Sequence, residues 1–500
     1  MAETEQQAEA LRPRVHDVVV VGGGFSSLAV LAELRGAGFD DVRVLERADS
    51  LGGTWRDNTY PGCACDVPSH LYSLSFAPRA DWSRTYAPWH EIRDYALQVA
   101  RDLDLERHFE FGRAVVEATN EGGVWRVRCA DGTWYGAHHL VLATGALSEP
   151  AVPDLDGLAD FDGPVVHSAR WPADLDVRGK RVLVVGTGAS AVQFVPWLQQ
   201  NAARMTVVQR TPPWVLPRRD RAYGPFARWA FAKVPGLRWL YRQSIFWRCE
   251  ARVLAFEHPA LMKLVKRWGR AHIARAVKDP ALRARLEPTY TPGCKRLLLS
   301  DDYYPALAQP NVRVVTDRIT RVGPRHVELE GEDGPYRVET DVLVFGTGFA
   351  VHALDRRLSV VGPEGRSLAD AWAQGAEAYL GTMVAGFPNL YLMTGPNTGL
   401  GHNSMLVMIE AQARQIRHVL SHLRANGLAA AVPRAAVQAA YNAALRVRAR
   451  KTVWLSGCRS WYLDEHGRNA TLWIGLASRF AARLRRFVAQ DYEYTPPEKR

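Results

Sequence analysis

The chain is 500 residues long, which predicts two or three domains with ample hydrophobic cores. Its composition is that of a globular protein, 47% hydrophobic and 23% charged, with a formal net charge of +11. Such a charge suits nucleic acid, a membrane surface or anionic cofactors. No nucleic-acid-binding motif accompanies it, so we expect no nucleic-acid partner.

The six cysteines are spread thinly, and no two form a Cys-x-x-Cys pair. The sequence therefore predicts no metal site, no redox dithiol and a reduced, cytoplasmic protein. We expect Cys63 and Cys65 to be packing residues, because one intervening residue closes a disulfide poorly. The polar N-terminus is unlike a secretory signal. The longest uncharged run, from Val18 to Ala32, is too short for a membrane span, which needs about 20 apolar residues.

Residues 1–14 are polar and predict a disordered tail. The next segment, D-V-V-V-V-G-G-G-F-S-S-L-A-V-L-A-E-L, joins a β-branched run, glycines and a helical apolar pattern. This order is typical of a dinucleotide-binding strand, turn and helix. Gly22 allows the tight turn, and Gly24 lets a phosphate approach the backbone. Ser26 begins the helix whose amides would face a pyrophosphate, and Ser27 replaces the third glycine of the pattern.

An acidic residue supports this first unit. Glu46 follows V-R-V-L at the end of the second expected strand, where a carboxylate can bind both ribose hydroxyls of a dinucleotide. A glycine turn beside a surface glutamate is the alternative, and the complete order of elements favours the dinucleotide site.

The same pattern returns about 160 residues later in R-V-L-V-V-G-T-G-A-S-A-V-Q-F-V. Gly186, Gly188 and Ala191 form its fingerprint, and the following strand ends in Arg210 rather than in an acid. A cation there suits a 2′-phosphate, which favours NADP over NAD. A surface arginine is the alternative reading of Arg210. The neighbouring residues expected to contact the same cofactor are Thr187, Ser190 and Thr211.

Two dinucleotide sites in one chain indicate a bound flavin and a diffusible nicotinamide. The segment H-L-V-L-A-T-G-A and its near copy D-V-L-V-F-G-T-G-F bracket the second unit. The sequence therefore predicts an α/β fold with two Rossmann-like domains. The expected division is an FAD-binding domain at 15–148 and 341–490, an NADP-binding domain at 151–340, a helical insertion at 215–290 within it, and a tail at 491–500.

Two longer motifs specify the family. The segment F-D-G-P-V-V-H-S-A-R-W-P fits F-x-G-x-x-x-H-x-x-x-W-P, with matches at Phe161, Gly163, His167, Trp171 and Pro172. The segment G-T-W-R-D-N-T-Y-P-G-C-A-C-D fits a second pattern, with matches at Gly53, Trp55, Tyr60, Pro61, Gly62 and Asp66. On these motifs the sequence resembles the FAD-dependent type I Baeyer–Villiger monooxygenases over nearly its whole length, and most closely the 4-hydroxyacetophenone monooxygenase branch.

This resemblance implies FAD, NADPH and dioxygen as reactants, with a ketone converted to an ester or lactone through a flavin C(4a)-peroxide. In Y-T-P-G-C-K-R, Lys295 would bind the NADP 2′-phosphate and Arg296 would lie over the flavin. A permanently charged guanidinium can stabilise the peroxide and the later oxyanion, and Asp66 would orient it. His167 would couple the two domains. A basic pair on a loop and a structural histidine are the alternatives.

The resemblance also implies residues that line the cofactors. Those expected beside the flavin are Thr54, Trp55, Tyr72, Val115 and Met405. Trp461, in C-R-S-W-Y, would belong to a mobile loop that closes over NADP. For each aromatic residue, ordinary core packing is the alternative.

Three rival functions remain. The first is oxidation of nitrogen or sulfur by a related flavin monooxygenase, which Trp171–Pro172 and Lys295–Arg296 disfavour. The second is a flavin reductase or a disulfide reductase, and the missing Cys-x-x-Cys pair disfavours the disulfide reductase. The third is a non-catalytic flavin-binding sensor, which two complete cofactor sites and the arginine disfavour.

Basic and aromatic residues alternate between Phe226 and Phe256. The basic residues are Arg228, Lys233, Arg238, Arg242, Arg248 and Arg252. The large apolar ones are Trp229, Phe231, Trp239, Leu240, Phe246 and Trp247. This pattern is compatible with weak, peripheral association with a membrane surface. The alternative is that the aromatics pack on the NADP domain while the arginines face water, and Pro235–Gly236 breaks any long amphipathic helix.

Overall fold

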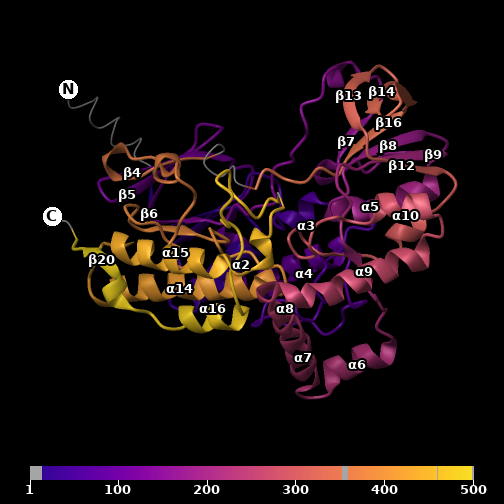
Figure 1. The fold of residues 1–500 in the computed structure, drawn as a ribbon. Helices are drawn as coiled ribbons and strands as arrows, with labels where there is room; N and C mark the ends of the chain where they lie inside the picture. Colours follow the sequence, from indigo (N-terminus) through magenta and orange to yellow (C-terminus); the bar gives the residue numbers. More distant parts are fainter. Residues whose placement is uncertain (1–13, 352–357, 459, 498–500) are drawn as a thin grey trace.

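The β-branched run before the first glycine turn forms the centre of the larger sheet in the computed structural model, which describes residues 14–351, 358–458 and 460–497 (Figure 1). β1 (Val15–Val21) pairs in parallel with β2 (Val42–Leu45) and β6 (Trp134–Leu142). Val18, Val19 and Val20 are fully buried, which suits residues whose branched side chains pack well on a pleated surface.

The larger sheet has eight strands in the order β17-β4-β5-β6-β1-β2-β3, with β18 also paired to β6. The remaining strands are β3 (Phe109–Glu110), β4 (Val115–Glu121), β5 (Val124–Cys129), β17 (Ser359–Val361) and β18 (Leu390–Leu392). Its strands therefore come from both ends of the chain, as the split first domain requires. α2 (Phe25–Arg35) and α14 (Met405–Ala425) lie side by side against it (Figure 1).

The second sheet is entirely parallel, in the order β12-β9-β8-β16-β7. Its strands are β7 (Val165–His167), β8 (Arg181–Val185), β9 (Arg204–Val208), β12 (Val312–Val315) and β16 (Val342–Phe345). An antiparallel sheet of β13 (Arg318–Gly323), β14 (His326–Gly331) and β15 (Gly334–Glu339) lies beside it (Figure 1). The predicted α/β class with two Rossmann-like units is confirmed.

Two boundaries differ from the prediction. β16 was expected to open the second FAD segment at 341, but it pairs with β7 and β8 in the smaller sheet. A buried parallel strand followed by a glycine turn fits either sheet, so its sequence does not reveal its partners. The expected tail at 491–500 contains β20 (Tyr492–Thr495), which pairs with β19 (Ala430–Pro433) because Tyr492 is buried in the core. The N-terminal tail lies outside the described residues, apart from Arg14.

The expected insertion at 215–290 begins with a short strand, β10 (Val215–Leu216), which pairs with β11 (Leu298–Leu299). Its helical part follows this strand. It consists of α6 (Pro225–Lys233), α7 (Leu237–Ala251), α8 (Val253–Glu257), α9 (Met262–Ala276) and α10 (Pro280–Leu286). α6 ends before Pro235–Gly236, and α7 begins immediately after it. The two helices form a hairpin that protrudes at the bottom of Figure 1.

The two halves of the molecule meet at the Y-P-G segment. Gly62 has φ +81°, and a Cβ atom there would lie 2.5 Å from the carbonyl oxygen of Gln193 on α5 (Ala189–Asn201). Only glycine allows this close backbone approach. The Tyr60 hydroxyl donates to Gln193 Oε1 at 2.9 Å, and Gln193 Nε2 donates to the carbonyl of Ala64 at 2.9 Å. The first residues of the motif thus hold α5 of the second unit against the first.

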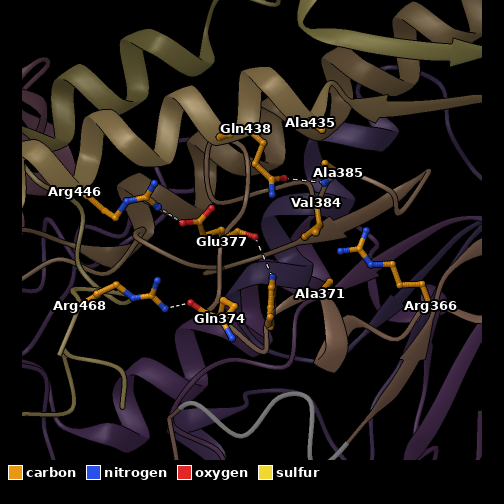
Figure 2. Close-up of a pocket in the computed structure, with 13 residues that line it drawn as sticks. Arg366, Ala371, Gln374, Glu377, Val384, Ala385, Ala435, Gln438, Arg446 and Arg468 are labelled. Atoms are coloured by element: carbon orange, nitrogen blue, oxygen red, sulfur yellow. Dashed lines mark hydrogen bonds and ion pairs between the residues drawn. The ribbon is translucent and has the colours of Figure 1, made fainter. Parts of the chain in front are cut away.

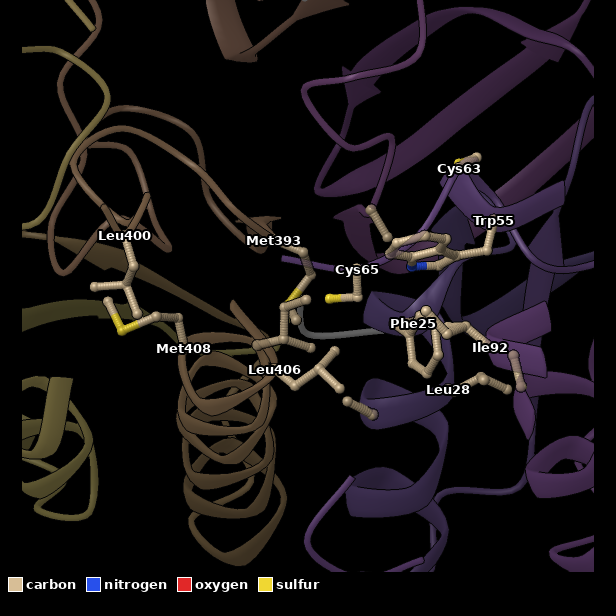
Figure 3. Packing of buried hydrophobic residues seen from close by; sticks show 14 of the residues in the cluster. Phe25, Leu28, Trp55, Cys63, Cys65, Ile92, Met393, Leu400, Leu406 and Met408 are labelled. Atoms are coloured by element: carbon tan, nitrogen blue, oxygen red, sulfur yellow. The ribbon is translucent and has the colours of Figure 1, made fainter. Parts of the chain in front are cut away.

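One hydrophobic core continues from this junction into the first unit (Figure 3). Phe25 and Leu28 of α2 belong to the same buried cluster as Leu406 and Met408 of α14. Cys65 lies in this cluster as well. Cys65, the neighbour of Asp66, is therefore held in the same buried cluster as residues of α2 and α14.

Candidate active site

The first glycine turn has the geometry that a pyrophosphate needs. Gly22 has φ +107°, and a Cβ atom there would lie 2.6 Å from the carbonyl oxygen of Ala143. Gly24 caps the N-terminus of α2, and a Cβ atom on Gly53 would come within 3.2 Å of its Cα. Facing glycines at a helix N-terminus leave a cradle that side chains would fill. Ser26, in the first turn of α2, is buried beneath it.

Glu46 lies at this turn, as its position after β2 predicts. Its carboxylate accepts hydrogen bonds from the amides of Gly23 at 2.6 Å and Ala48 at 2.9 Å. Arg56 Nη1 lies 3.0 Å from Glu46 Oε1, the oxygen that also accepts the amide of Ala48. The buried carboxylate is thereby fixed in orientation beside the glycines, where a ribose would follow the pyrophosphate.

An aromatic cluster lies next to the same turn. Trp55 Nε1 donates to the Tyr72 hydroxyl at 3.0 Å, and the Tyr72 ring also meets Phe25 edge to face. Thr54 begins α3 (Thr54–Asp57) and is exposed beside Trp55. Met405 is the first residue of α14, and its helix N-terminus opens from the Gly-rich segment before it. Val115 begins β4, and the nearby amide of Arg113 donates to the carbonyl of Glu46.

The second glycine turn repeats the first. Gly186 has φ +100°, and a Cβ atom there would lie 2.6 Å from the carbonyl oxygen of Gly346. A Cβ atom on Gly346 would lie only 2.9 Å from the Cβ atom of Ala191, so the two residues pack closely. Gly188 caps α5. Thr187 donates through its hydroxyl to the carbonyl of Thr211 at 3.3 Å, and half-buried Ser190 lies in the first turn of α5.

Arg210 and Lys295 lie close enough for their charges to interact, although 85 positions separate them. Burial lowers the pKa of Lys295, and the positive charge of Arg210 lowers it further. Neither side chain forms an ion pair with a carboxylate among the described residues. Two like charges held together without a counter-ion are the arrangement that a bound phosphate would neutralise.

The central feature of the site is the ion pair between Arg296 and Asp66. Arg296 Nε donates to Asp66 Oδ2 at 3.1 Å, and its Nη2 donates to the same oxygen. Burial disfavours the Asp66 carboxylate, but the charge and hydrogen bonds of Arg296 outweigh it and lower the Asp66 pKa. The same carboxylate raises the pKa of Arg296. About a third of each side chain is exposed, so the pair stays open to a ligand.

Two residues that the sequence analysis did not single out complete this centre. The Tyr462 hydroxyl lies beside Arg296, and burial with the nearby Asp66 charge raises its pKa to about 12. Arg218 Nη2 donates to the carbonyl of Cys65 at 3.0 Å and adds a second positive charge near Asp66. Trp461 is exposed next to Tyr462, with ring centroids 4.5 Å apart. The available signal for Tyr462 was its adjacency to Trp461.

The expectation of a fully reduced protein is wrong for two cysteines. Cys294 and Cys458 form a disulfide across 164 positions, with Cα atoms 6.2 Å apart. No local motif marks a pair so far apart in sequence, so only the fold reveals it. Cys63 and Cys65 are free and buried, as expected of packing residues, and burial raises the pKa of Cys63 to about 12. The bridge joins the segment of Lys295 and Arg296 to the one carrying Trp461 and Tyr462.

The interdomain fingerprint lies where the two sheets approach each other. His167 ends β7, and its Nδ1 accepts the amide of Ala169 at 3.1 Å. Burial lowers its pKa, and its ring meets Phe349, which follows β16, edge to face. Trp171, followed by Pro172, packs on Phe194 of α5 at 5.4 Å between centroids. These contacts brace the smaller sheet around the turn after β16.

The first residues of the fingerprint have a packing role. Phe161 belongs to the core of the smaller sheet with Leu183 and Leu343. Gly163 lies against the carbonyl of Asp341, where a Cβ atom would collide. Both residues therefore fix the path of the linker into β7.

Glu250 of α7 is a buried carboxylate that the sequence did not mark. It accepts hydrogen bonds from Asn403 Nδ2 at 2.7 Å, from the amide of Ala477 at 3.1 Å and from the hydroxyl of Ser478 at 2.7 Å. His402 Nε2 lies 3.4 Å away. Burial opposes the charge, but these partners prevail and lower the Glu250 pKa to about 2. Glu250 thus ties the insertion to the loop before α14 and to the N-terminus of α16 (Ala477–Leu484).

One cavity lies away from these residues. It has a volume of about 580 Å³ and lies between α15 (Ala435–Ala449) and the chain around α13 (Leu368–Ala371) (Figure 2). Its polar groups mostly bind one another: Arg446 pairs with Glu377, and Gln438 accepts the amide of Ala385. None of the residues predicted to bind FAD or NADP lines it.

The fold and its two glycine turns are those of oxidoreductases that bind two dinucleotides. A family model described as pyridine nucleotide-disulphide oxidoreductase matches residues 16–245. A Baeyer-Villiger monooxygenase of Streptomyces coelicolor is 45% identical over 502 residues, covering 99% of this chain and 95% of its own. A Baeyer-Villiger monooxygenase of Pseudomonas aeruginosa is 44% identical, covering 96% and 91%.

Among solved structures, an oxidized steroid monooxygenase bound to NADP superposes with a TM-score of 0.87 at 30% identity, covering 97% of this chain and 100% of that one. The chain belongs to the Baeyer–Villiger monooxygenase family and is an oxidoreductase.

We expect Glu250→Gln to destabilise the protein near neutral pH by about 3 kcal/mol, because the amide cannot accept all the donors around it. The lowered pKa means that the Glu250 contribution is present above the ordinary glutamate value and is lost as the pH falls toward about 2. Urea unfolding should therefore show a constant difference between wild type and variant above the ordinary glutamate pKa of 4.5, and the two should converge as the pH falls from there toward about 2. A pH-independent gap would contradict this account. Glu465→Gln, at an exposed glutamate, is the control.

We expect dithiothreitol to lower the melting temperature of the wild type, because opening a bridge between distant positions releases chain entropy worth about 2–5 kcal/mol. Cys458→Ser should melt at the temperature of the reduced wild type and should not respond to the reductant. The four free cysteines are buried and cannot produce this difference. Equal shifts in both proteins would show that no bridge forms.

Proposed function

We propose that this chain binds FAD at the first glycine turn and NADPH at the second, and uses dioxygen to convert a ketone into an ester or lactone. The observation that carries the proposal is the Arg296–Asp66 pair, which joins the segment after the first glycine turn to the segment after the helical insertion and remains partly exposed. Oxygenation of a ketone panel by purified protein, with the products identified by mass spectrometry, tests it.

The first turn fits FAD. Gly22 and Gly24 would admit the pyrophosphate, Glu46 would hold the ribose, and Trp55 with Tyr72 would wall the isoalloxazine. Thr54, Val115 and Met405 would complete that lining. Bound FAD would supply the reduction of dioxygen, which no side chain of the protein can perform.

Arg296 would supply the fixed positive charge that this chemistry needs. A guanidinium keeps its charge at every working pH and can stabilise oxyanions that form next to it. Asp66 would hold it in place through the shared carboxylate oxygen, and Tyr462 would limit its movement from the other side. The residues that act on the ketone are thus Arg296 directly and Asp66 through it.

The second turn fits NADPH. Gly186, Gly188 and Ala191 would admit its pyrophosphate, with Thr187, Ser190 and Thr211 around it. Arg210 and Lys295 would bind the 2′-phosphate, because they are held together without a carboxylate partner. Trp461 would close over the nicotinamide half, and His167 would transmit the position of one sheet to the other.

The structure speaks against two rivals. A disulfide reductase needs a reactive thiol pair beside the flavin, whereas burial raises the pKa of both Cys63 and Cys65. A sensor without catalysis would not need a charged, partly exposed guanidinium between the cofactors. Nitrogen or sulfur oxidation uses the same cofactors, and the expected ester product separates it from ketone oxidation.

Three finer assignments belong to this proposal. We assign residues 15–148 and 351–490 to FAD and 151–350 to NADP, giving β16 to the second domain. The residues around the two family motifs support the 4-hydroxyacetophenone monooxygenase branch. We place the protein in the cytoplasm, in peripheral contact with a membrane.

Replacing Arg210 with alanine should raise the KM for NADPH about tenfold or more while leaving the KM for NADH nearly unchanged, because only NADPH loses a phosphate contact. Steady-state oxidation of each coenzyme measures this. Arg204→Ala removes an exposed arginine from the start of β9, the strand that precedes Arg210, and serves as the control. Equal use of both coenzymes by the wild type would refute the phosphate assignment.

Replacing Arg296 with alanine should leave FAD bound but lower ester formation by about 10²–10³-fold, because the developing oxyanion loses its counter-charge. Asp66→Ala should act in the same direction with a smaller effect. FAD absorbance and product quantification measure both. Arg325→Ala removes an exposed arginine that also pairs with an aspartate and should retain activity. Wild-type ester formation by Arg296→Ala would overturn the mechanism.

A further inference from the structure

The hairpin of α6 and α7 exposes an unusual number of large apolar side chains. We call Phe226, Trp229, Trp239, Leu240 and Trp247 the hairpin face; their exposed fractions lie between 55% and 78%. The hairpin protrudes from the body of the molecule (Figure 1). Clustered exposed aromatics of this size are costly in water and mark interaction sites.

The hairpin face is not the side of the hairpin that packs against the protein, because the opposite sides of the two helices already do so. Phe231 of α6 and Tyr241 of α7 meet with ring centroids 5.0 Å apart, and His70 packs on Phe231 at 4.3 Å. Ile245 is buried with Leu71 further along α7. Apolar residues thus occupy both sides of the hairpin, and only one side has a partner within the chain.

The charge of the hairpin is almost entirely positive. Residues 221–252 contain one acidic residue, Glu250, whose carboxylate is buried and hydrogen-bonded. They contain seven basic residues, namely Arg221, Arg228, Lys233, Arg238, Arg242, Arg248 and Arg252. None of the seven forms an ion pair with a carboxylate in the described part of the chain. Arg242 points inward to backbone carbonyls, and the other six leave positive charge without a carboxylate partner around the exposed tryptophans.

We propose that the hairpin face docks on an anionic lipid bilayer. Tryptophan side chains favour the interface between headgroups and acyl chains, and basic residues around them are attracted by acidic headgroups. A second copy of the chain is a poorer partner, because a symmetric contact would set these positive helices against each other. No helix among the described residues is long and apolar enough to cross a bilayer, so docking would be peripheral.

This docking would bring the candidate active site close to the lipid surface. Arg242 of α7 donates to the carbonyls of His70 at 2.9 Å and Ser73 at 2.8 Å. These residues belong to the segment that runs from Asp66 through Tyr72 to Ser73. Resting on the function proposed above, the inference therefore names a substrate class: ketones that partition into membranes.

Sedimentation with vesicles tests the docking directly. The full-length FAD-loaded protein should pellet with vesicles of phosphatidylglycerol and phosphatidylcholine at 20 mM salt, and much less with phosphatidylcholine alone. Binding should fall steeply at 1 M salt, where the screening length shrinks to about 3 Å. Failure to pellet with the acidic vesicles at low salt would overturn the proposal.

Matched variants locate the surface. Combined Trp229→Ser, Trp239→Ser and Trp247→Ser should weaken vesicle binding at least about tenfold. Trp134→Ser, at an exposed tryptophan of β6, should bind like the wild type. Combined Lys233→Gln and Arg238→Gln should weaken binding by about fivefold for each charge removed. Equal binding by the triple-tryptophan variant and the wild type would overturn the assignment of this face.

Two further readouts separate the possible failures. Oxygenation of a water-soluble ketone without vesicles should proceed at the same rate in the wild type and the triple-tryptophan variant. A wild type without this activity would count against the proposed function and not against docking. Sedimentation velocity without lipid should show no self-association that depends on these tryptophans. A dimer abolished by the triple variant, with no vesicle binding, would assign the face to a second copy and overturn the proposal.

Discussion

The ion pair between Asp66 and Arg296 is the interaction on which the candidate site depends. It joins residues 230 positions apart, one following the Y-P-G segment of the first unit and the other following the helical insertion of the second. A partly exposed pair contributes little to stability by itself. Its value is positional, because the buried neighbours Cys65 and Tyr462 pack beside the two partners. Packing thus sets the positions of the two side chains, and the pair itself supplies the charge.

Arg210 and Lys295 show the opposite arrangement. There the fold brings two like charges together and lowers the pKa of Lys295, a cost that folding alone would not select. Such a cost is tolerated where a ligand removes it, and a bound 2′-phosphate would do so. Arg296 thus has a carboxylate partner, whereas Lys295 and Arg210 form no ion pair with a carboxylate among the described residues.

The features that could be predicted are those written in short stretches of sequence. The strands and glycine turns at Gly22 and Gly186 follow from local pattern, as does the position of Glu46 after β2. The features that could not be predicted are pairings between distant segments. β16 has the same local pattern as a strand of the larger sheet, and nothing near Cys294 points to Cys458. Glu250 looks like one more helical glutamate until the fold places it beneath the amides of α16. The pairing of Asp66 with Arg296 was expected only through resemblance to a known family.

Three kinds of contact between the halves converge on one place. The close approach of Gly62 to Gln193, the Asp66–Arg296 pair and the Cys294–Cys458 bridge all lie within segments that carry site residues. A relative movement of the two sheets would therefore change the site first, because the disulfide and the ion pair connect the two halves there and would have to break or move with them. The insertion adds a fourth link, because Glu250 attaches α7 to the loop before α14 while Arg242 attaches the same helix to the segment after Asp66. A force applied to the exposed side of α7 would reach both halves of the site through buried Glu250 and half-buried Arg242.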